Sequence, residues 1–156
     1  MKVCIVIDVV EGTAKESLPH MIELLQNRPT SFPSLEIAIR WSVRSKLVRN
    51  LESAKVSIPA QLKLDESSGK YVWRTDLLKS KPFWDGWFDN LSKKFLSCPG
   101  SRVLILAGTD RLDTELTIAQ MQGKYELILL PSCGHTIQED VILTFQHFSL
   151  LLKPMN

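Results

Sequence analysis

The sequence has little net charge, no long hydrophobic run and no closely spaced pair of cysteines. Its formal net charge is only +2, which gives no reason to expect nucleic acid or a membrane as a partner. The apolar run after Lys2 covers just residues 3–7, so no signal peptide is visible. No stretch approaches the roughly 20 apolar residues that a membrane-spanning helix needs.

The cysteines and histidines also lack the spacing of a metal site. The three cysteines, Cys4, Cys98 and Cys133, are odd in number and form no C-x-x-C pair, which predicts a reduced, intracellular protein of the cytoplasm, the nucleus or both. The sequence contains no H-E-x-x-H, no Walker loop and no dinucleotide glycine fingerprint. We therefore expect neither a metal nor a cofactor.

The most informative part of the chain is a series of predicted strands, a turn and a helix near the C-terminus. An apolar strand over residues 103–107 precedes an acid-bearing turn, a helix over 114–122 with Asp113 as its N-cap, and a second apolar strand over 125–130. Cys133-Gly134-His135 follows. This order is typical of the end of an α/β-hydrolase, where the acid and the histidine lie at the carboxyl ends of neighbouring parallel strands.

The β-branched run over residues 3–7 predicts a further strand, buried on both faces of a parallel sheet. Only three convincing strands are found, which leaves one open hydrophobic edge. The fold class expected is therefore α/β, as the C-terminal part of an α/β-hydrolase fold. Further expected elements are helices over 14–26 (kinked or starting late because of Pro19), 34–45 with Ser34 as N-cap, 51–58 with Asn50 as N-cap, 90–96 and 138–152, and an exposed loop over 64–70.

The chain divides by composition into a core, residues 1–32 and 100–156, and an inserted helical cap, residues 33–99. The segment 33–99 holds 12 lysines and arginines against 7 acids, together with all four tryptophans. This basic excess suits an acidic peptide partner, or is an ordinary solvated surface. Its aromatic residues either line a pocket for an apolar substrate or simply attach the cap to the core; they are Trp73, Phe83, Trp84, Trp87 and Phe88.

Three residues are candidates for acid–base chemistry. His135 is the candidate base, because it follows a strand end and a glycine. Asp8, which ends the first strand, and Asp110, which follows the second, are equally good candidates for the acid that orients it. A nucleophile is missing, since no G-x-S-x-G occurs in the sequence. Ser132 is too close to His135 along the chain, and Cys133 is better explained by core packing.

Several long blocks resemble the protein phosphatase methylesterase family. They are residues 7–14 (IDVVEGTA), 49–54 (RNLESA), 84–88 (WDGWF), 110–113 (DRLD), 120–124 (QMQGK) and 133–135 (CGH). The resemblance covers nearly the whole chain. It implies a serine esterase of α/β-hydrolase fold that removes the methyl ester from the C-terminal leucine of the type 2A protein phosphatase catalytic subunit, which would also be its partner.

The resemblance also implies roles for single residues. It makes Asp8 the acid and His135 the base of a catalytic triad. Independently of the resemblance, Trp84, Trp87 and Phe88 are the aromatic residues that we expect to bind substrate. In the family, the serine elbow and the oxyanion-hole glycines precede the block at residues 7–14, and they are missing here. We therefore expect a C-terminal portion that is inactive alone. The alternatives are a catalytically inactive module that binds the phosphatase, or a truncated fragment.

Overall fold

The computed structural model describes residues 2–108 and 112–141, except for the side chain of Asp85. Asp110 and most of the predicted helix over 138–152 lie outside these residues. The described residues fall into two compact units: 2–23 with 80–132, and 24–79 with 133–141. The predicted division into a core, residues 1–32 and 100–156, and a cap, residues 33–99, stays a prediction.

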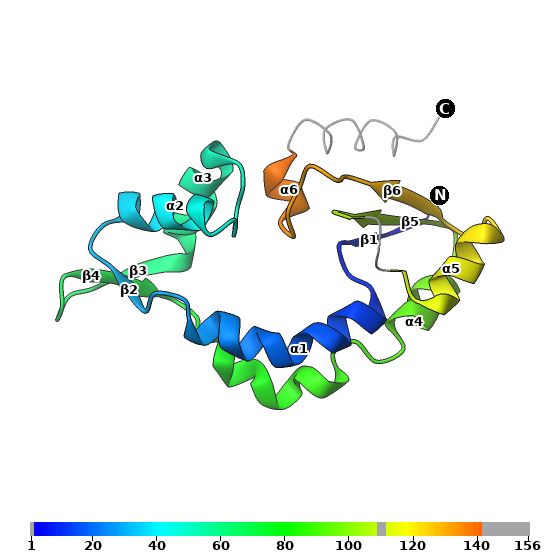
Figure 1. The fold of residues 1–156 in the computed structure, drawn as a ribbon, viewed down its shortest axis with the longest axis horizontal. Coiled ribbons are helices and arrows are strands. Elements are labelled where there is room, and N and C mark those ends of the chain that lie inside the picture. The colour runs from blue at the N-terminus through cyan, green and yellow to red at the C-terminus, as the bar shows by residue number, and fades with distance from the viewer. Residues whose placement is uncertain (1, 109–111, 142–156) are drawn as a thin grey trace. The chain divides into compact units, whose positions relative to one another are not determined.

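The first unit is built on a three-stranded parallel sheet (Figure 1). Its order is β1 (Val3–Ile7), β5 (Ser101–Leu106), β6 (Glu126–Leu129), with β5 in the centre. Ile7 is paired with Ile105, and Leu106 with Leu129, so the three strands end at one edge. These are the three strands predicted from the sequence, and β1 forms one edge of the sheet.

One face of this sheet carries the core of the unit. Leu104 and Leu106 pack against α4 (Leu91–Ser97) and α5 (Thr114–Met121), with Phe95 and Tyr125 in edge-to-face contact at 5.3 Å between ring centroids. On the other face, Ile5 and Ile7 of β1 are 39% and 37% exposed. The prediction that this strand is buried on both faces is therefore wrong at these two positions.

Helix α1 (Glu11–Gln26) follows β1 and is one helix despite Pro19, so the predicted late start is wrong. It begins in the first unit and its last residues belong to the second. The 3₁₀ segment η1 (Leu77–Gly86) likewise continues from the second unit into the first.

The second unit contains α2 (Leu35–Arg44), α3 (Leu51–Gln61), the short α6 (Ile137–Asp140) and a small antiparallel sheet. The order in this sheet is β2 (Ser31–Phe32), β4 (Lys70–Trp73), β3 (Leu62–Asp65). The predicted exposed loop over 64–70 is thus mostly the end of a β-hairpin. Asp65 orders the turn, because its carboxylate accepts hydrogen bonds from the hydroxyls of Ser67 and Ser68.

The core of the second unit combines aliphatic and aromatic side chains. Ala38, Ala54 and Ile58 are fully buried between the helices. Around them Phe32 contacts the rings of Trp41 and Trp73, each with 5.6 Å between centroids. Both helices begin at the predicted N-caps: Ser34 accepts from the N–H of Ile37, and Asn50 from the N–H groups of Glu52 and Ser53.

Candidate functional site

Asp8 is fixed at the carboxyl edge of the parallel sheet. Its backbone N–H donates to the carbonyl of Ile105 at 2.7 Å, and its Oδ1 accepts from the N–H of Ala107 at 2.9 Å. Its φ of +52° is left-handed, a conformation that few residues other than glycine adopt. The turn therefore holds the carboxylate beside the next strand, at the edge where parallel sheets place their chemistry.

The loop that carries His135 is held by Asp140, which the sequence analysis missed. Oδ2 of Asp140 accepts from the N–H of Gly134 at 2.7 Å. Its Oδ1 accepts from the N–H groups of Arg49 at 2.7 Å and Asn50 at 3.3 Å. One carboxylate thus joins the residue before His135 to the start of α3. Hydrogen bonds to a charged acceptor are the stronger kind, so this is a firm attachment.

The same contact explains why residue 134 is a glycine. A Cβ at Gly134 would lie 3.1 Å from Oδ2 of Asp140 and 3.2 Å from Nε of Arg49. Gly134 is not among the glycines with a positive φ. Its role here is therefore close approach, and not a backbone conformation that only glycine adopts easily.

The residues around His135 are anchored while His135 itself is exposed. Cys133 is 2% exposed and Ile137 is fully buried, so the packing role predicted for Cys133 fits the structure. The hydroxyl of Thr136 donates to the carbonyl of Leu47 at 3.2 Å. The loop therefore presents an accessible imidazole on a short segment whose neighbouring residues are held by packing and hydrogen bonds.

Asp8 belongs to the first unit and His135 to the second, so each is placed only within its own unit. Asp110, the other candidate acid, lies outside the described residues. Asp113 has the predicted structural role: its Oδ1 accepts from the N–H of Leu116 at 2.9 Å and caps α5.

The aromatic residues predicted to bind substrate have different environments. Trp84 is 4% exposed, and its indole N–H donates to Oγ of Ser80 at 2.8 Å. Trp87 is 52% exposed with its ring centroid 6.4 Å from that of Trp84, and Phe88 is half-buried. Trp84 forms part of an open groove of about 610 Å³ together with Lys15, Leu18, Pro19, Ile22, Lys81 and Pro82. Trp73, which the sequence grouped with them, belongs to the other unit.

Similarity to characterised proteins is high along most of the chain. It is 54% identical over 159 residues to protein phosphatase methylesterase 1 of Schizosaccharomyces pombe, a match that covers 96% of this chain and 46% of that protein. The protein of the same name from Yarrowia lipolytica is 54% identical over 86% of this chain and 32% of its own length. For the Rattus norvegicus protein the identity is 43%, over 86% of this chain and 45% of its own length.

The chain is a homologue of protein phosphatase methylesterase. It spans between about a third and a half of the length of these relatives. No family model matches it.

Among solved structures, an E-2-(acetamidomethylene)succinate hydrolase superimposes with a TM-score of 0.68 at 9% identity, covering 97% of this chain and 56% of that one. An esterase of Mycobacterium tuberculosis gives 0.58 at 15% identity, covering 94% and 53%. These likenesses confirm the α/β-hydrolase fold class.

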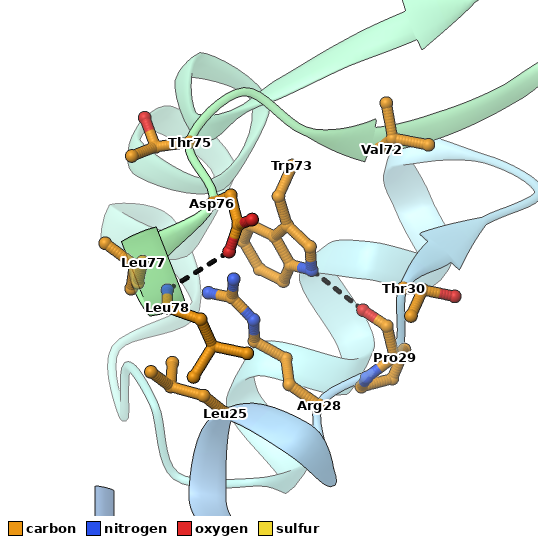
Figure 2. A pocket seen from close by; sticks show the side chains of 10 residues that line it. All are labelled: Leu25, Arg28, Pro29, Thr30, Val72, Trp73, Thr75, Asp76, Leu77 and Leu78. Carbon is orange, nitrogen blue, oxygen red and sulfur yellow. Dashed lines mark hydrogen bonds between the residues drawn. The ribbon is translucent and has the colours of Figure 1, made fainter. Parts of the chain in front are cut away.

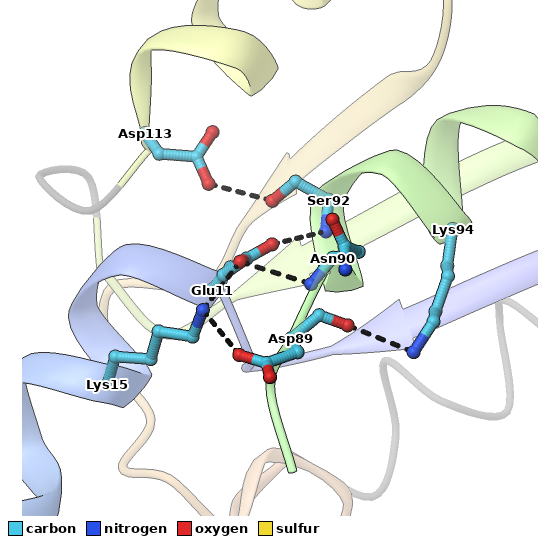
Figure 3. A network of polar contacts seen from close by, with 7 residues as sticks. All are labelled: Glu11, Lys15, Asp89, Asn90, Ser92, Lys94 and Asp113. Carbon is cyan, nitrogen blue, oxygen red and sulfur yellow. Dashed lines mark hydrogen bonds and ion pairs between the residues drawn. The ribbon is translucent and has the colours of Figure 1, made fainter. Parts of the chain in front are cut away.

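A polar network in the first unit joins two of the blocks that resemble the methylesterases, residues 7–14 and 110–113 (Figure 3). Glu11 accepts from the backbone N–H groups of Asn90 and Ser92, each at 3.2 Å, and pairs with Lys15 at 2.9 Å. Lys15 also pairs with Asp89 at 2.8 Å. The hydroxyl of Ser92 donates to Oδ2 of Asp113 at 2.7 Å. The network connects the segment after Asp8 to the starts of α4 and α5, so it positions these blocks rather than carrying chemistry.

Two further observations concern possible metal sites and membrane-spanning helices in the described part of the chain. Within residues 2–108 and 112–141, no group of three or more histidines, cysteines or acids is placed to hold a metal ion. None of the helices in the described part of the chain is long and apolar enough to cross a membrane.

Proposed function

We propose that the protein carrying this chain is a carboxylesterase acting on the C-terminal leucine methyl ester of the type 2A protein phosphatase catalytic subunit. The observation that carries the proposal is the identity of 54% over 96% of the chain to a protein named protein phosphatase methylesterase 1. The cytoplasm, the nucleus or both would be the place of action.

In the proposed mechanism this chain supplies the acid and the base. His135 takes the proton of a serine hydroxyl while the serine oxygen bonds to the ester carbonyl carbon. It then returns that proton to the methoxide oxygen as the carbon–oxygen bond breaks, which releases methanol and leaves an acyl-serine. Water, deprotonated by His135, attacks the acyl carbon. The bond to the serine oxygen breaks as His135 returns the proton to that oxygen, which frees the carboxylate and restores the serine hydroxyl. Asp8 orients the imidazole and stabilises its positive charge.

The local geometry supports these roles one residue at a time. Asp8 lies at the carboxyl edge of the sheet with its conformation fixed by two hydrogen bonds to the neighbouring strand. His135 is exposed on a loop held by Asp140. Trp87 has the exposed aromatic surface that could contact the peptide next to the ester. The serine would come from an elbow motif that this sequence does not contain.

The absent motif favours a second candidate function for the 156-residue chain alone: binding the phosphatase without turnover. The test is to incubate the methylated phosphatase catalytic subunit with two samples, the protein purified from its own organism and the 156-residue chain. Methanol release and mass spectrometry of the C-terminal peptide measure demethylation, and co-precipitation measures binding.

The esterase proposal expects demethylation by the natural protein and its loss in the natural protein carrying His135→Gln, with His20→Gln as the matched control. Loss of the nucleophile costs several orders of magnitude in rate, so the 156-residue chain should leave the ester intact. If the natural protein carries no esterase activity but retains the phosphatase, the binding function replaces the catalytic one.

A further inference from the structure

The second unit contains a small cavity that the proposed reaction does not use (Figure 2). It measures about 230 Å³, enough for one short aliphatic chain, and lies where the end of α1 meets β4 and the start of η1. Its lining is mainly apolar but includes one cation and one anion. The lining residues are Leu25, Arg28, Pro29, Thr30, Val72, Trp73, Thr75, Asp76, Leu77 and Leu78.

One wall of the cavity is rigid because Trp73 is held on several sides. Its indole N–H donates to the carbonyl of Pro29 at 2.8 Å. Its ring contacts Phe32 at 5.6 Å and Trp41 at 6.1 Å between centroids, both in edge-to-face arrangement. The cavity therefore has a fixed aromatic surface that is continuous with the core of the second unit.

Arg28 lies on that surface, with its guanidinium stacked on the indole ring of Trp73. Its guanidinium carbon is 4.0 Å from the centroid of the Trp73 ring, a cation–π contact. Stacking occupies the flat face of a guanidinium and leaves its N–H groups pointing outward in the plane. Among the hydrogen bonds and ion pairs of the described residues, none involves the Arg28 side chain.

The surroundings favour an anion beside this guanidinium. Burial lowers the pKa of Arg28 from its usual value, because water that would solvate the charge is partly excluded, whereas the charge of Asp76 raises it. The Asp76 carboxylate accepts from the N–H of Leu78 at 3.1 Å and is not ion-paired to Arg28 in the described part of the chain. A half-buried cation whose N–H groups make no hydrogen bond to the described residues gains from a carboxylate that binds its edge.

We propose that this cavity binds a carboxylate carried on a short aliphatic chain, with the carboxylate on the edge of Arg28 and the aliphatic part against Leu25, Leu77 and Leu78. The single guanidinium and the nearby Asp76 disfavour a doubly charged phosphate, which would meet more repulsion than one arginine offsets. The carboxylate that binds belongs either to a small carboxylic acid or to the C-terminal residue of a peptide. This binding does not rest on the proposed esterase activity.

The test titrates the chain with 4-methylpentanoate and with the uncharged 4-methylpentanamide, following the indole N–H signal of Trp73 by NMR. We expect 4-methylpentanoate to shift this signal with a dissociation constant on the order of 1 mM, as suits a ligand of this size. The amide should bind at least about tenfold more weakly, because it loses the charge-assisted bonds. Acetyl-glycyl-valine, with a free or an amidated C-terminus, distinguishes the two kinds of ligand. If the peptide with the free C-terminus binds more tightly than 4-methylpentanoate, the site is assigned to peptides. If that peptide binds more weakly than 4-methylpentanoate, the site is assigned to small acids.

Variants separate binding from folding. Arg28→Gln should weaken 4-methylpentanoate at least about tenfold. Arg74→Gln, an exposed arginine that does not line the cavity, should leave binding unchanged. Asp76→Asn should tighten binding about two- to threefold, a gain that misfolding cannot produce. Equal binding of acid and amide, inorganic phosphate binding more tightly than the acid, or no tightening in Asp76→Asn would overturn the proposal.

Discussion

A single carboxylate, that of Asp140, decides where the candidate base is held. It accepts three backbone N–H groups from two segments, those of Gly134, Arg49 and Asn50. Arg49 and Asp140 are 91 residues apart in the sequence. Local sequence patterns cannot reveal such a contact, because each of the residues is unremarkable in its own neighbourhood. An acid in the first turn of a helix is an ordinary helix feature, so Asp140 carried no signal of this role.

Removing the Asp140 carboxylate should therefore loosen the base loop. In Asp140→Ala three backbone donors lose their acceptor, and we expect a loss of about 1–3 kcal/mol in the free energy of unfolding. Amide hydrogen exchange at Gly134 should become much faster. Urea unfolding and exchange measured by NMR check both effects.

The matched control for Asp140→Ala is Glu36→Gln, which removes an acid from an ion pair with Arg40 where both side chains are 72% exposed. Such a pair is worth about 0–1 kcal/mol, so its removal should change stability little and leave Gly134 exchange unchanged. Similar losses in both variants would show that Asp140 is only another surface charge.

At the scale of elements, the beginnings of the three helices with a capping side chain were predictable and the hairpin was not. Ser34, Asn50 and Asp113 start their helices because a short polar side chain can accept a backbone N–H within its own first turn. The hairpin of β3 and β4 has only four residues in each strand, and its turn is polar. β3 pairs with β4 across this turn, and β4 also pairs with β2, which lies far earlier in the sequence. A loop-like composition conceals both pairings.

Two asparagines at helix starts offer a direct test of the N-cap argument. Asn50 accepts from the N–H groups of Glu52 and Ser53, so Asn50→Ala should cost about 1 kcal/mol. Asn90 precedes α4 at a φ of +57° and makes no side-chain capping bond. Asn90→Gly should therefore be neutral or slightly stabilising, since glycine adopts a left-handed φ without strain. Thermal unfolding of both variants gives the comparison, and equal losses would contradict it.

The stabilisation that Glu11 provides by linking α1 to the start of α4 should depend on pH. The pKa of Glu11 is lowered from its usual value, first by its hydrogen bond with Lys15 and then by the N–H groups of Ser92 and Asn90. A lowered pKa in the folded state means that the stabilisation is present above the unfolded-state pKa of about 4.5 and is lost as the pH falls through the folded-state value.

Glu11→Gln removes this titration. The stability of the Glu11→Gln variant should therefore fall less steeply than that of the unaltered chain between about pH 5 and pH 3. The difference in stability between the two proteins should be larger at neutral pH than at low pH. Urea unfolding at stepped pH measures the two slopes. Glu16→Gln, an exposed acid on the same helix, serves as control and should keep the full slope. Parallel curves for Glu11→Gln and the unaltered chain would remove Glu11 from the acid transition.

At the scale of the whole chain, the sequence predicted the fold class and the three strands of the parallel sheet. Both follow from three apolar runs of strand length and from the order of elements between them. The exposure of Ile5 and Ile7 was not predictable, because a β-branched run looks the same whether or not a second layer covers it. That exposure places apolar surface on an edge strand, which pairs only with β5 among the described strands.

An edge strand with exposed apolar side chains is a site of self-association. We therefore expect the 156-residue chain to associate with rising concentration in sedimentation velocity, and Ile5→Lys to weaken that association about tenfold by placing a charge on the strand. Met121→Lys is the matched control, since Met121 is 85% exposed at the end of α5 and away from the edge strand. A chain that stays monomeric at high concentration, or equal effects of the two substitutions, would show that the edge of β1 does not drive association.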